Sequence, residues 1–262
     1  MLKSLIKDKK YFYKKNGYLI VRNLLNKNDV KKLRKKILKY FADLPENKKD
    51  LVTLPAGDIV KNFPEIFEIQ NKQVLIDTLR ILFSKSVNYI NTFQIQKNCS
   101  SLNYRSGWHI DAGSQEKYEK LNKDLEDHSS YQLGKIGIYL QDKSPFGQSI
   151  SVVPGLHRNA FFRKVLFRLL KNKIFSKLTH KIFVRDLQKE LNSGDAVIFD
   201  CRLPHRSSVT SKVINRNFDA DLSLDENSKL VIYFEAGKRS SCETYLRNSL
   251  TRMIQEEVFE GR

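Results

Sequence analysis

The feature that most restricts the possible fold is a series of short β-branched and aromatic runs in the later part of the chain. Glycine, proline and asparagine turns separate the runs, and no βαβ alternation connects them. The runs are VNYINTFQIQ, GKIGIYLQD, SISVVPG, DAVIFD and KLVIYFEAG, beginning at residues 87, 134, 149, 195 and 229. Short strands without crossover helices favour antiparallel sheets that close or double on themselves over a parallel sheet.

Helical patterns are concentrated nearer the N-terminus. A short helix, an Asn16-Gly17 turn and the strand-like YLIV come first, an amphipathic helix follows NLLNKND, and NKQVLIDTLRILF has helical periodicity at 71–83. We therefore predict an α+β fold with a mainly β core, a cupin-like double-stranded β-helix or jelly roll, flanked by N-terminal helices. Because no repeat or linker is visible, we expect one domain over residues 1–262.

Composition limits the setting of this 262-residue chain. No stretch has the length and apolar character of a bilayer span, and the N-terminus lacks the hydrophobic centre of a secretory signal. Three widely spaced cysteines, Cys99, Cys201 and Cys242, indicate neither a disulfide framework nor a zinc knuckle. We expect a cytoplasmic protein with reduced thiols.

The formal net charge of +18 attracts acidic partners, but basic residues without acidic neighbours cluster in only one segment. No Asp or Glu occurs from Lys143 to Arg185, and FFRKVLFRLLKNKIF within it alternates apolar and basic residues at helical spacing. We predict a basic helical insertion at about 158–185. Two interpretations remain open: a helix packed on the body with a solvated basic face, or a surface helix that contacts an anionic membrane weakly. No nucleic-acid motif is present, so no specific nucleic-acid partner is expected.

Two polar side chains in GWHIDAG can point at one object. His109 and Asp111 are two residues apart, so in an extended segment they project from the same face, and Trp108 before them is expected to pack in the core. A third ligand is found in LNSGDAVIFDCRLPHRSSV, where a buried strand leads to His205. In a jelly roll an early and a late strand can end at the same mouth. Two imidazoles and one carboxylate there form the facial triad of non-haem Fe(II) oxygenases, whereas zinc prefers a tetrahedral set.

Four stretches, taken in order, resemble the phytanoyl-CoA dioxygenase family of Fe(II)- and 2-oxoglutarate-dependent oxygenases. They are NGYLIVRNLLNKNDVKKLRKKI, WHID, GQSISVVPGLHR and LNSGDAVIFDCRLPHRS, within a span from about Phe12 to Gly237. The resemblance implies a double-stranded β-helix and a ferrous ion on His109, Asp111 and His205. It also implies that 2-oxoglutarate and O2 are consumed to give succinate, CO2 and a hydroxylated product. Related halogenases place a small residue at the carboxylate position, so Asp111 favours hydroxylation over halogenation.

The 2-oxoglutarate carboxylate needs a cationic partner, and here the sequence departs from the family pattern. The family places an arginine about ten residues after the distal histidine. Arg216 has this separation but falls in an enlarged loop, while Lys229 begins the next strand and Arg206 adjoins the ligand. Arg216 is favoured narrowly. Ser207 matches a position that often contacts the keto acid, and Gln94 can face the barrel interior.

We expect an enzyme, an Fe(II)- and 2-oxoglutarate-dependent dioxygenase that hydroxylates a small or conjugated metabolite. An acid-free insertion near the pocket favours an anionic substrate. Two alternatives stay open: a jelly-roll binding module that has lost turnover, and a basic protein whose main role is to bind a membrane or nucleic-acid surface.

Overall fold

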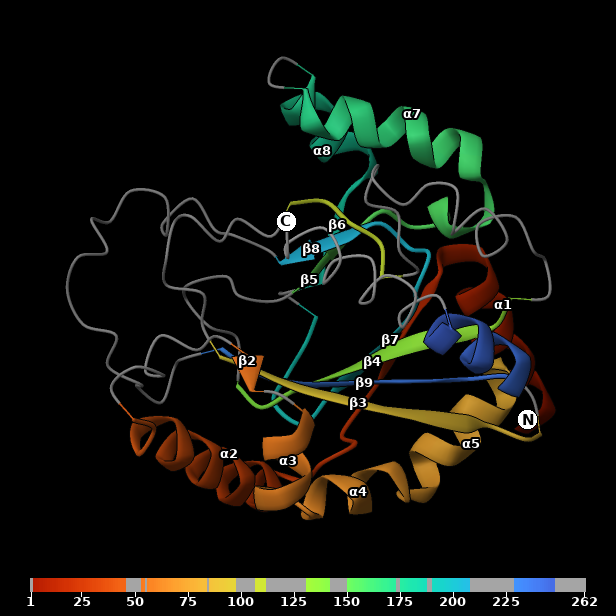
Figure 1. Cartoon of the computed structure of the whole chain (residues 1–262). Helices are drawn as coiled ribbons and strands as arrows, with labels where there is room; N and C mark the ends of the chain where they lie inside the picture. The colour runs from red at the N-terminus through yellow and green to blue at the C-terminus, as the bar shows by residue number, and fades with distance from the viewer. Residues whose placement is uncertain are drawn as a thin grey trace.

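The computed structural model contains two antiparallel sheets accompanied by helices (Figure 1). It describes residues 2–45, 53–54, 56–83, 85–97, 107–111, 131–141, 150–172, 175–187, 190–207 and 229–247. The larger sheet has the strand order β1-β7-β4-β9-β3-β2 and the smaller has the order β6-β5-β8. Two packed antiparallel sheets with flanking helices are the α+β, jelly-roll arrangement that the strand pattern predicted.

The larger sheet is formed by strands that are far apart in the sequence. Its members, in spatial order, are β1 (Tyr18–Val21), β7 (Ala196–Asp200), β4 (Leu133–Tyr139), β9 (Leu230–Gly237), β3 (Asn88–Lys97) and β2 (Thr53–Leu54). Every described pairing is antiparallel. The smaller sheet consists of β6 (Arg185–Asp186), β5 (Ile150–Val152) and β8 (His205–Ser207). Each strand predicted from the sequence is present within a few residues of its expected position.

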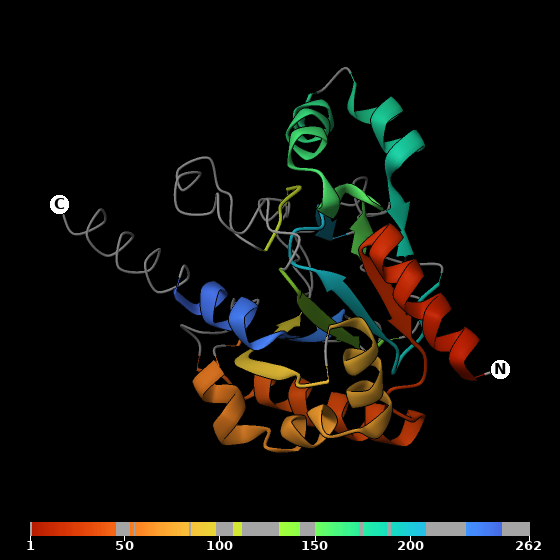
Figure 2. The same cartoon turned by 90° about the vertical axis from the view of Figure 1, so that its right-hand side faces the viewer.

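Four helices cover the outer face of the larger sheet (Figures 1 and 2): α2 (Lys27–Ala42), α3 (Ala56–Asn62), α4 (Glu65–Gln70) and α5 (Gln73–Leu82). Asn26 caps α2, because its side-chain oxygen accepts a hydrogen bond from the Asp29 backbone N–H at 2.8 Å. The buried face of α2 carries Val30, Leu33, Ile37 and Phe41 at helical spacing. These side chains join alternate residues of the sheet, including Ile136 and Ile198, in the main hydrophobic core. The N-terminal α1 (Leu2–Asn16) contributes Tyr13 to that core.

The opposite pleat of the larger sheet faces the smaller sheet. Tyr18, Val197 and Phe199 point to this side, together with Tyr139, Val231 and Tyr233, and they pack against Ile150 and Val152 of β5. Successive strand residues alternate between this interior and the helix-covered core. The strands thus form a barrel-like interior whose end carries the candidate site.

The turn before β7 depends on a glycine. Gly194 has a φ of +86°, and a Cβ atom on it would lie 2.2 Å from the Leu25 carbonyl oxygen. Its own N–H donates to the Tyr139 carbonyl, and its carbonyl accepts from the Leu25 N–H. Glycine is needed here for both the left-handed backbone and the close approach. The turn fixes the start of the strand that leads to His205.

The predicted basic insertion forms two α-helices, α7 (Ala160–Lys171) and α8 (Ser176–Phe183), after the 3-10 turn η3 (Leu156–Arg158). Both helices lie beside the smaller sheet, on the side away from α2–α5 (Figures 1 and 2). Leu166 and Leu170 of α7 pack with Val153 and Trp108, and this tryptophan is buried as expected. None of the helices in the described part of the chain combines the length and hydropathy that a membrane crossing requires.

Candidate metal centre

A backbone pairing brings the two predicted histidine ligands together. The His109 N–H donates to the His205 carbonyl and the His205 N–H donates to the His109 carbonyl, both at 3.0 Å. On its other side β8 pairs with β5, which places His205 opposite Val152. The two imidazole rings lie side by side with their centroids 4.2 Å apart. Segments separated by almost a hundred residues thus present two rings at one end of the barrel-like interior.

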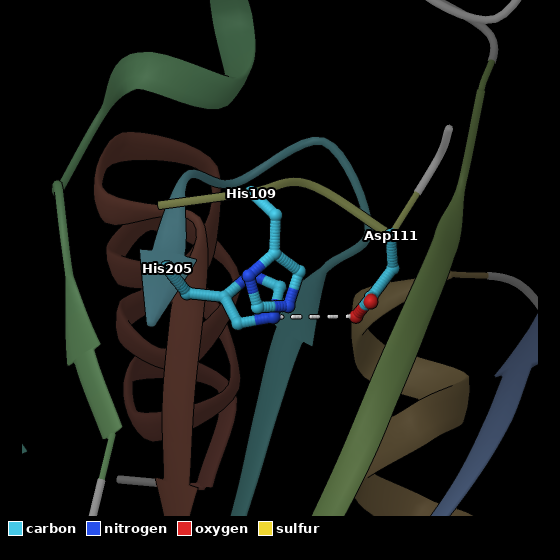
Figure 3. Close-up of side chains that lie close together, drawn as sticks. All are labelled: His109, Asp111 and His205. Carbon is cyan, nitrogen blue, oxygen red and sulfur yellow. Dashed lines mark ion pairs between the residues drawn. The ribbon is translucent and has the colours of Figure 1, made fainter. Parts of the chain in front are cut away.

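Asp111 completes the cluster, as Figure 3 shows. Its Oδ2 atom lies 3.5 Å from His205 Nε2. One ligand atom from each of His109, Asp111 and His205 can be chosen so that all three lie within 4.8 Å of one another. His205 is buried, Asp111 is partly buried and His109 is exposed, so the cluster opens toward solvent on the His109 side. The structure therefore brings together the three residues that the sequence analysis selected.

The hydrogen bonds of the two rings define which nitrogen is available. His109 Nδ1 lies 2.8 Å from the Gly107 carbonyl oxygen, and His205 Nδ1 lies 2.9 Å from the Leu203 carbonyl oxygen. A carbonyl can only accept, so each Nδ1 donates a proton and each neutral ring keeps its lone pair on Nε2. Orientation of a ligating imidazole by such a bond is the usual arrangement at metal centres.

The charges around Asp111 keep it ionised. Burial alone would raise the pKa of Asp111, but Lys135 and then the two imidazoles lower it to about 2. Burial, the largest effect, and the neighbouring positive groups lower the pKa of His205 to about 4, although Asp111 opposes them. At neutral pH a carboxylate oxygen and an imidazole lone pair therefore face each other at 3.5 Å.

Two lone pairs at this separation repel unless a cation lies between them. Asp111 Oδ2 is also buried and accepts no hydrogen bond from the residues described. Buried polar atoms normally have a partner. The donor set of two imidazoles and one carboxylate thus fits a divalent metal ion.

A buried ion-pair network borders the cluster, and sequence reasoning missed it. Lys135 Nζ lies 3.5 Å from Asp111 Oδ1 and 3.6 Å from Glu235 Oε1. Burial alone would lower the pKa of Lys135, but the two carboxylates raise it above its ordinary value. Thr92 donates a hydrogen bond to Glu235 Oε2. The available signal was one charged residue inside each of the apolar runs LGKIGIY and LVIYFEAG. In the structure these two residues, Lys135 and Glu235, are direct partners between β4 and β9.

The candidate cosubstrate residues are separated by the pleat of β8. Ser207 is two residues after His205, and its Oγ accepts a hydrogen bond from buried Lys229 Nζ at 3.2 Å. Arg206 lies between His205 and Ser207 in the sequence, but its side chain points toward the α7–α8 side. Its guanidinium contacts His180 Nε2 at 2.5 Å and stacks 5.0 Å from the Trp108 ring centre. The structure thus joins Lys229 to Ser207 and directs Arg206 to the helices.

Of the two other predicted cosubstrate residues, Gln94 and Arg216, the structure describes only Gln94. Gln94 is partly buried on β3 opposite Tyr233, whose ring packs in the interior between the sheets. Gln94 therefore lies on the interior pleat, and its contact with the cosubstrate stays a prediction. Arg216 lies outside the described residues.

Known proteins share this fold. No family model matches the chain, and no curated protein matches it in sequence. Among solved structures, the chain is similar to the non-heme alpha ketoglutarate dependent epimerase SnoN from nogalamycin biosynthesis, with a TM-score of 0.57, 12% identity, and coverage of 89% of this chain and 83% of that one. It is also similar to EctD from S. alaskensis with 2-oxoglutarate and 5-hydroxyectoine, with a TM-score of 0.57, 16% identity, and coverage of 89% and 76%. AviO1 from Streptomyces viridochromogenes Tue57 gives a TM-score of 0.56, 14% identity, and coverage of 89% and 95%.

These similarities establish the class of fold. The chain has the jelly-roll fold of these proteins over most of its length, which confirms the predicted fold class. SnoN is a non-haem, alpha-ketoglutarate-dependent epimerase, and the EctD structure contains 2-oxoglutarate. The resemblance to the phytanoyl-CoA dioxygenase family pointed to neighbours of this kind.

Proposed function

We propose that the protein is an Fe(II)- and 2-oxoglutarate-dependent dioxygenase that hydroxylates a small or conjugated metabolite. The observation that carries the proposal is the convergence of His109, Asp111 and His205, whose ligand atoms lie within 4.8 Å of one another. Two imidazoles and a carboxylate on one side of a metal leave the remaining octahedral positions for other ligands, as in non-haem Fe(II) oxygenases. A zinc site would instead be tetrahedral. The fold shared with 2-oxoglutarate-dependent enzymes supports the choice of iron.

The protein's own contribution is to hold the ligands in place and to keep Asp111 and His205 unprotonated at neutral pH. The Gly107 and Leu203 carbonyls orient the imidazoles, and Lys135 holds Asp111 Oδ1 so that Oδ2 faces the cluster. When bound, Fe(II) and 2-oxoglutarate supply the means to activate O2, because decarboxylation of the keto acid provides two electrons. In the balanced reaction one oxygen atom of O2 enters succinate and the other becomes the product hydroxyl group, while CO2 is released.

Lys229 with Ser207 is our proposed anchor for the distal carboxylate of 2-oxoglutarate. The ammonium group is buried, and Ser207 lies on the same side of β8 as His205 because strand residues alternate. An ammonium group and a neighbouring hydroxyl can both donate hydrogen bonds to a carboxylate. Arg206 is the weaker candidate, since its guanidinium contacts Trp108 and His180.

The carboxylate of Asp111 supports hydroxylation over halogenation, since it occupies the position that halogenases leave to chloride. An anionic substrate and a cytoplasmic setting belong to the same proposal. The net charge of +18 supports the former, and the free buried thiols of Cys201 and Cys242 support the latter.

The test is conversion of 2-oxoglutarate to succinate by the purified chain with Fe(II) under air, followed by mass spectrometry of a metabolite extract incubated under heavy O2. We expect Fe(II)-dependent succinate and a metabolite that gains one heavy oxygen atom. Asp111→Ala should abolish both signals, whereas Lys31→Ala on the distant α2 should retain them. Tight metal binding without succinate formation would contradict the enzyme proposal and favour a binding module.

A further inference from the structure

The α7–α8 pair presents an unusual amount of apolar surface to solvent. Seven of the twelve exposed large hydrophobic residues in the described part of the chain lie between residues 161 and 183. Phe161 is 71% exposed and Phe162 is 60% exposed, and the set is Phe161, Phe162, Val165, Phe175, Leu178, Ile182 and Phe183. Scattered single apolar residues are ordinary on protein surfaces, but seven of them on one pair of packed helices mark a contact surface. We call these seven residues the apolar patch.

The outer face of α7 carries Phe161 and Val165 and differs from the face that attaches this helix to the body. Leu166 and Leu170 face inward and pack against Trp108 and Val153. Phe161 and Val165 lie four residues apart on the outer face, and exposed Arg168 follows one turn later. A helix that buries one apolar face and exposes a second apolar face is expected to bind another apolar surface through the second face.

The charged side chains of α7 and α8 are all basic, and Asp186 is the first acidic residue after them. Arg158, Arg168, Lys177 and Lys181 are exposed, and none of them forms an ion pair with another residue that the structure describes. The sequence from Lys143 to Arg185 contains no acidic residue. Exposed aromatic and aliphatic side chains bordered by lysine and arginine fit the interface of an anionic bilayer, where the apolar groups enter the acyl boundary and the cations meet lipid phosphates.

We propose that the α7–α8 pair docks the protein on a membrane surface that contains anionic lipid. The inference stands on the helices alone and does not depend on the proposed function. It favours lipid over a second copy of the chain because a symmetric contact would bring the same uncompensated cations of two copies together. The patch lies on the side of the molecule away from α2–α5 (Figures 1 and 2), so those helices would face the solvent.

The docking surface is connected to the candidate metal centre. His180 of α8 accepts from Arg206, which adjoins the ligand His205, and Trp108 adjoins the ligand His109 while packing against α7. A protein docked through this pair would therefore hold the His109 side of the centre near the lipid interface. Substrates that partition into membranes would be presented on that side.

The experiment is flotation of the full chain with vesicles of phosphatidylcholine alone or mixed with phosphatidylserine, at low and high salt. We expect binding to the mixed vesicles that weakens with salt. Lys177→Ala with Lys181→Ala should weaken binding by about 25-fold, since each cation near an anionic surface contributes about fivefold. Phe162→Ser with Leu178→Ser should weaken it by at least about tenfold, because the inserted apolar groups are lost.

Matched controls use exposed residues on the opposite side of the molecule. Lys31→Ala with Lys35→Ala on α2 makes the same charge change, and Val60→Ser with Val74→Ser makes a smaller change of the same apolar-to-polar kind at two exposed positions. Both controls should bind as the wild type does, and circular dichroism verifies that every variant is folded. The proposal is overturned if mixed vesicles do not bind the chain, or if the α2 variant loses as much binding as the α8 variant. It is also overturned if the patch variants change only the oligomeric state, which would assign the surface to a second copy.

Discussion

Replacement of Lys135 by methionine tests the ion-pair network beside the metal ligands. The lysine ammonium lies 3.5 Å from Asp111 Oδ1, 3.6 Å from Glu235 Oε1 and 5.3 Å from the centre of the Tyr233 ring. Methionine keeps a similar length and apolar stem but removes the charge. Two carboxylates would then share a largely buried space without a cation.

The expected cost follows from these distances. At an effective dielectric constant of about 20, a pair of opposite charges about 3.5 Å apart attracts by about 5 kcal/mol. Much of this attraction offsets the desolvation of the lysine. Removal of one partner from a buried ion pair costs about 3–5 kcal/mol, and we expect Lys135→Met to lower the free energy of unfolding of the metal-free protein by that amount.

The assay is urea unfolding at neutral pH with and without Mn(II), which resists oxidation in air. A metal ion beside Asp111 replaces part of the missing positive charge, so Mn(II) should stabilise Lys135→Met more than it stabilises the wild type. Glu235→Gln is the control, because it leaves the Lys135–Asp111 contact in place and should cost less. An unfolding free energy of Lys135→Met within about 0.5 kcal/mol of the wild type would refute the reasoning.

Three further predictions test other parts of the molecule. Lys229→Met should raise the KM for 2-oxoglutarate by at least about tenfold, because a hydrogen bond to a charged group contributes about 1.5–3 kcal/mol. Metal binding, measured by quenching of the fluorescence of the single tryptophan, Trp108, should stay unchanged. An unaltered KM would exclude this anchor. Burial lowers the pKa of His157 from 6.5 to about 4, so as the pH falls from 6.5 to 4 the unfolded chain gains a proton that the folded chain does not. The free energy of unfolding should therefore fall by roughly 3 kcal/mol as the pH falls from 6.5 to 4. Chemical denaturation of His157→Gln at each pH should show that this part of the pH dependence is lost. Gly194→Ala should lower the free energy of unfolding by at least about 2 kcal/mol, because the φ of +86° and the nearby Leu25 carbonyl oxygen oppose a side chain. Gly57→Ala is the control for the thermal melts. It has open space around the new methyl group and should be neutral or stabilising.

The strands could be predicted because their local chemistry agrees with their tertiary environment. DAVIFD is apolar on both sides because β7 contacts the helix-covered core with one face and the barrel-like interior with the other. In a jelly roll, segments far apart in the sequence can meet at one mouth, which made the convergence of His109 and His205 predictable; in the structure His205 begins β8 and His109 pairs with it in an isolated bridge. Alternation along β8 could also have separated Arg206 from Ser207, since residues one apart project from opposite faces.

The features that sequence reasoning missed depend on register between distant strands. Lys135 and Glu235 are a hundred residues apart, and each alone resembles an isolated charge in an apolar strand. Only the pairing of β4 with β9 places them opposite one another and beside Asp111. Likewise, the partnership of Lys229 with Ser207 depends on where β9 starts relative to β8. A single sequence does not encode such registers in any short motif.

The role of the three converging side chains is tested most directly by equilibrium dialysis against Fe(II) without oxygen, with the bound iron measured for each variant. We expect the wild-type chain and His180→Gln, which alters an imidazole outside the cluster, to retain a single ferrous ion. We expect His205→Ala and Asp111→Ala to lose it. Retention of iron by His205→Ala with wild-type affinity, or failure of the wild type to retain iron at all, would show that these three side chains do not form an iron site.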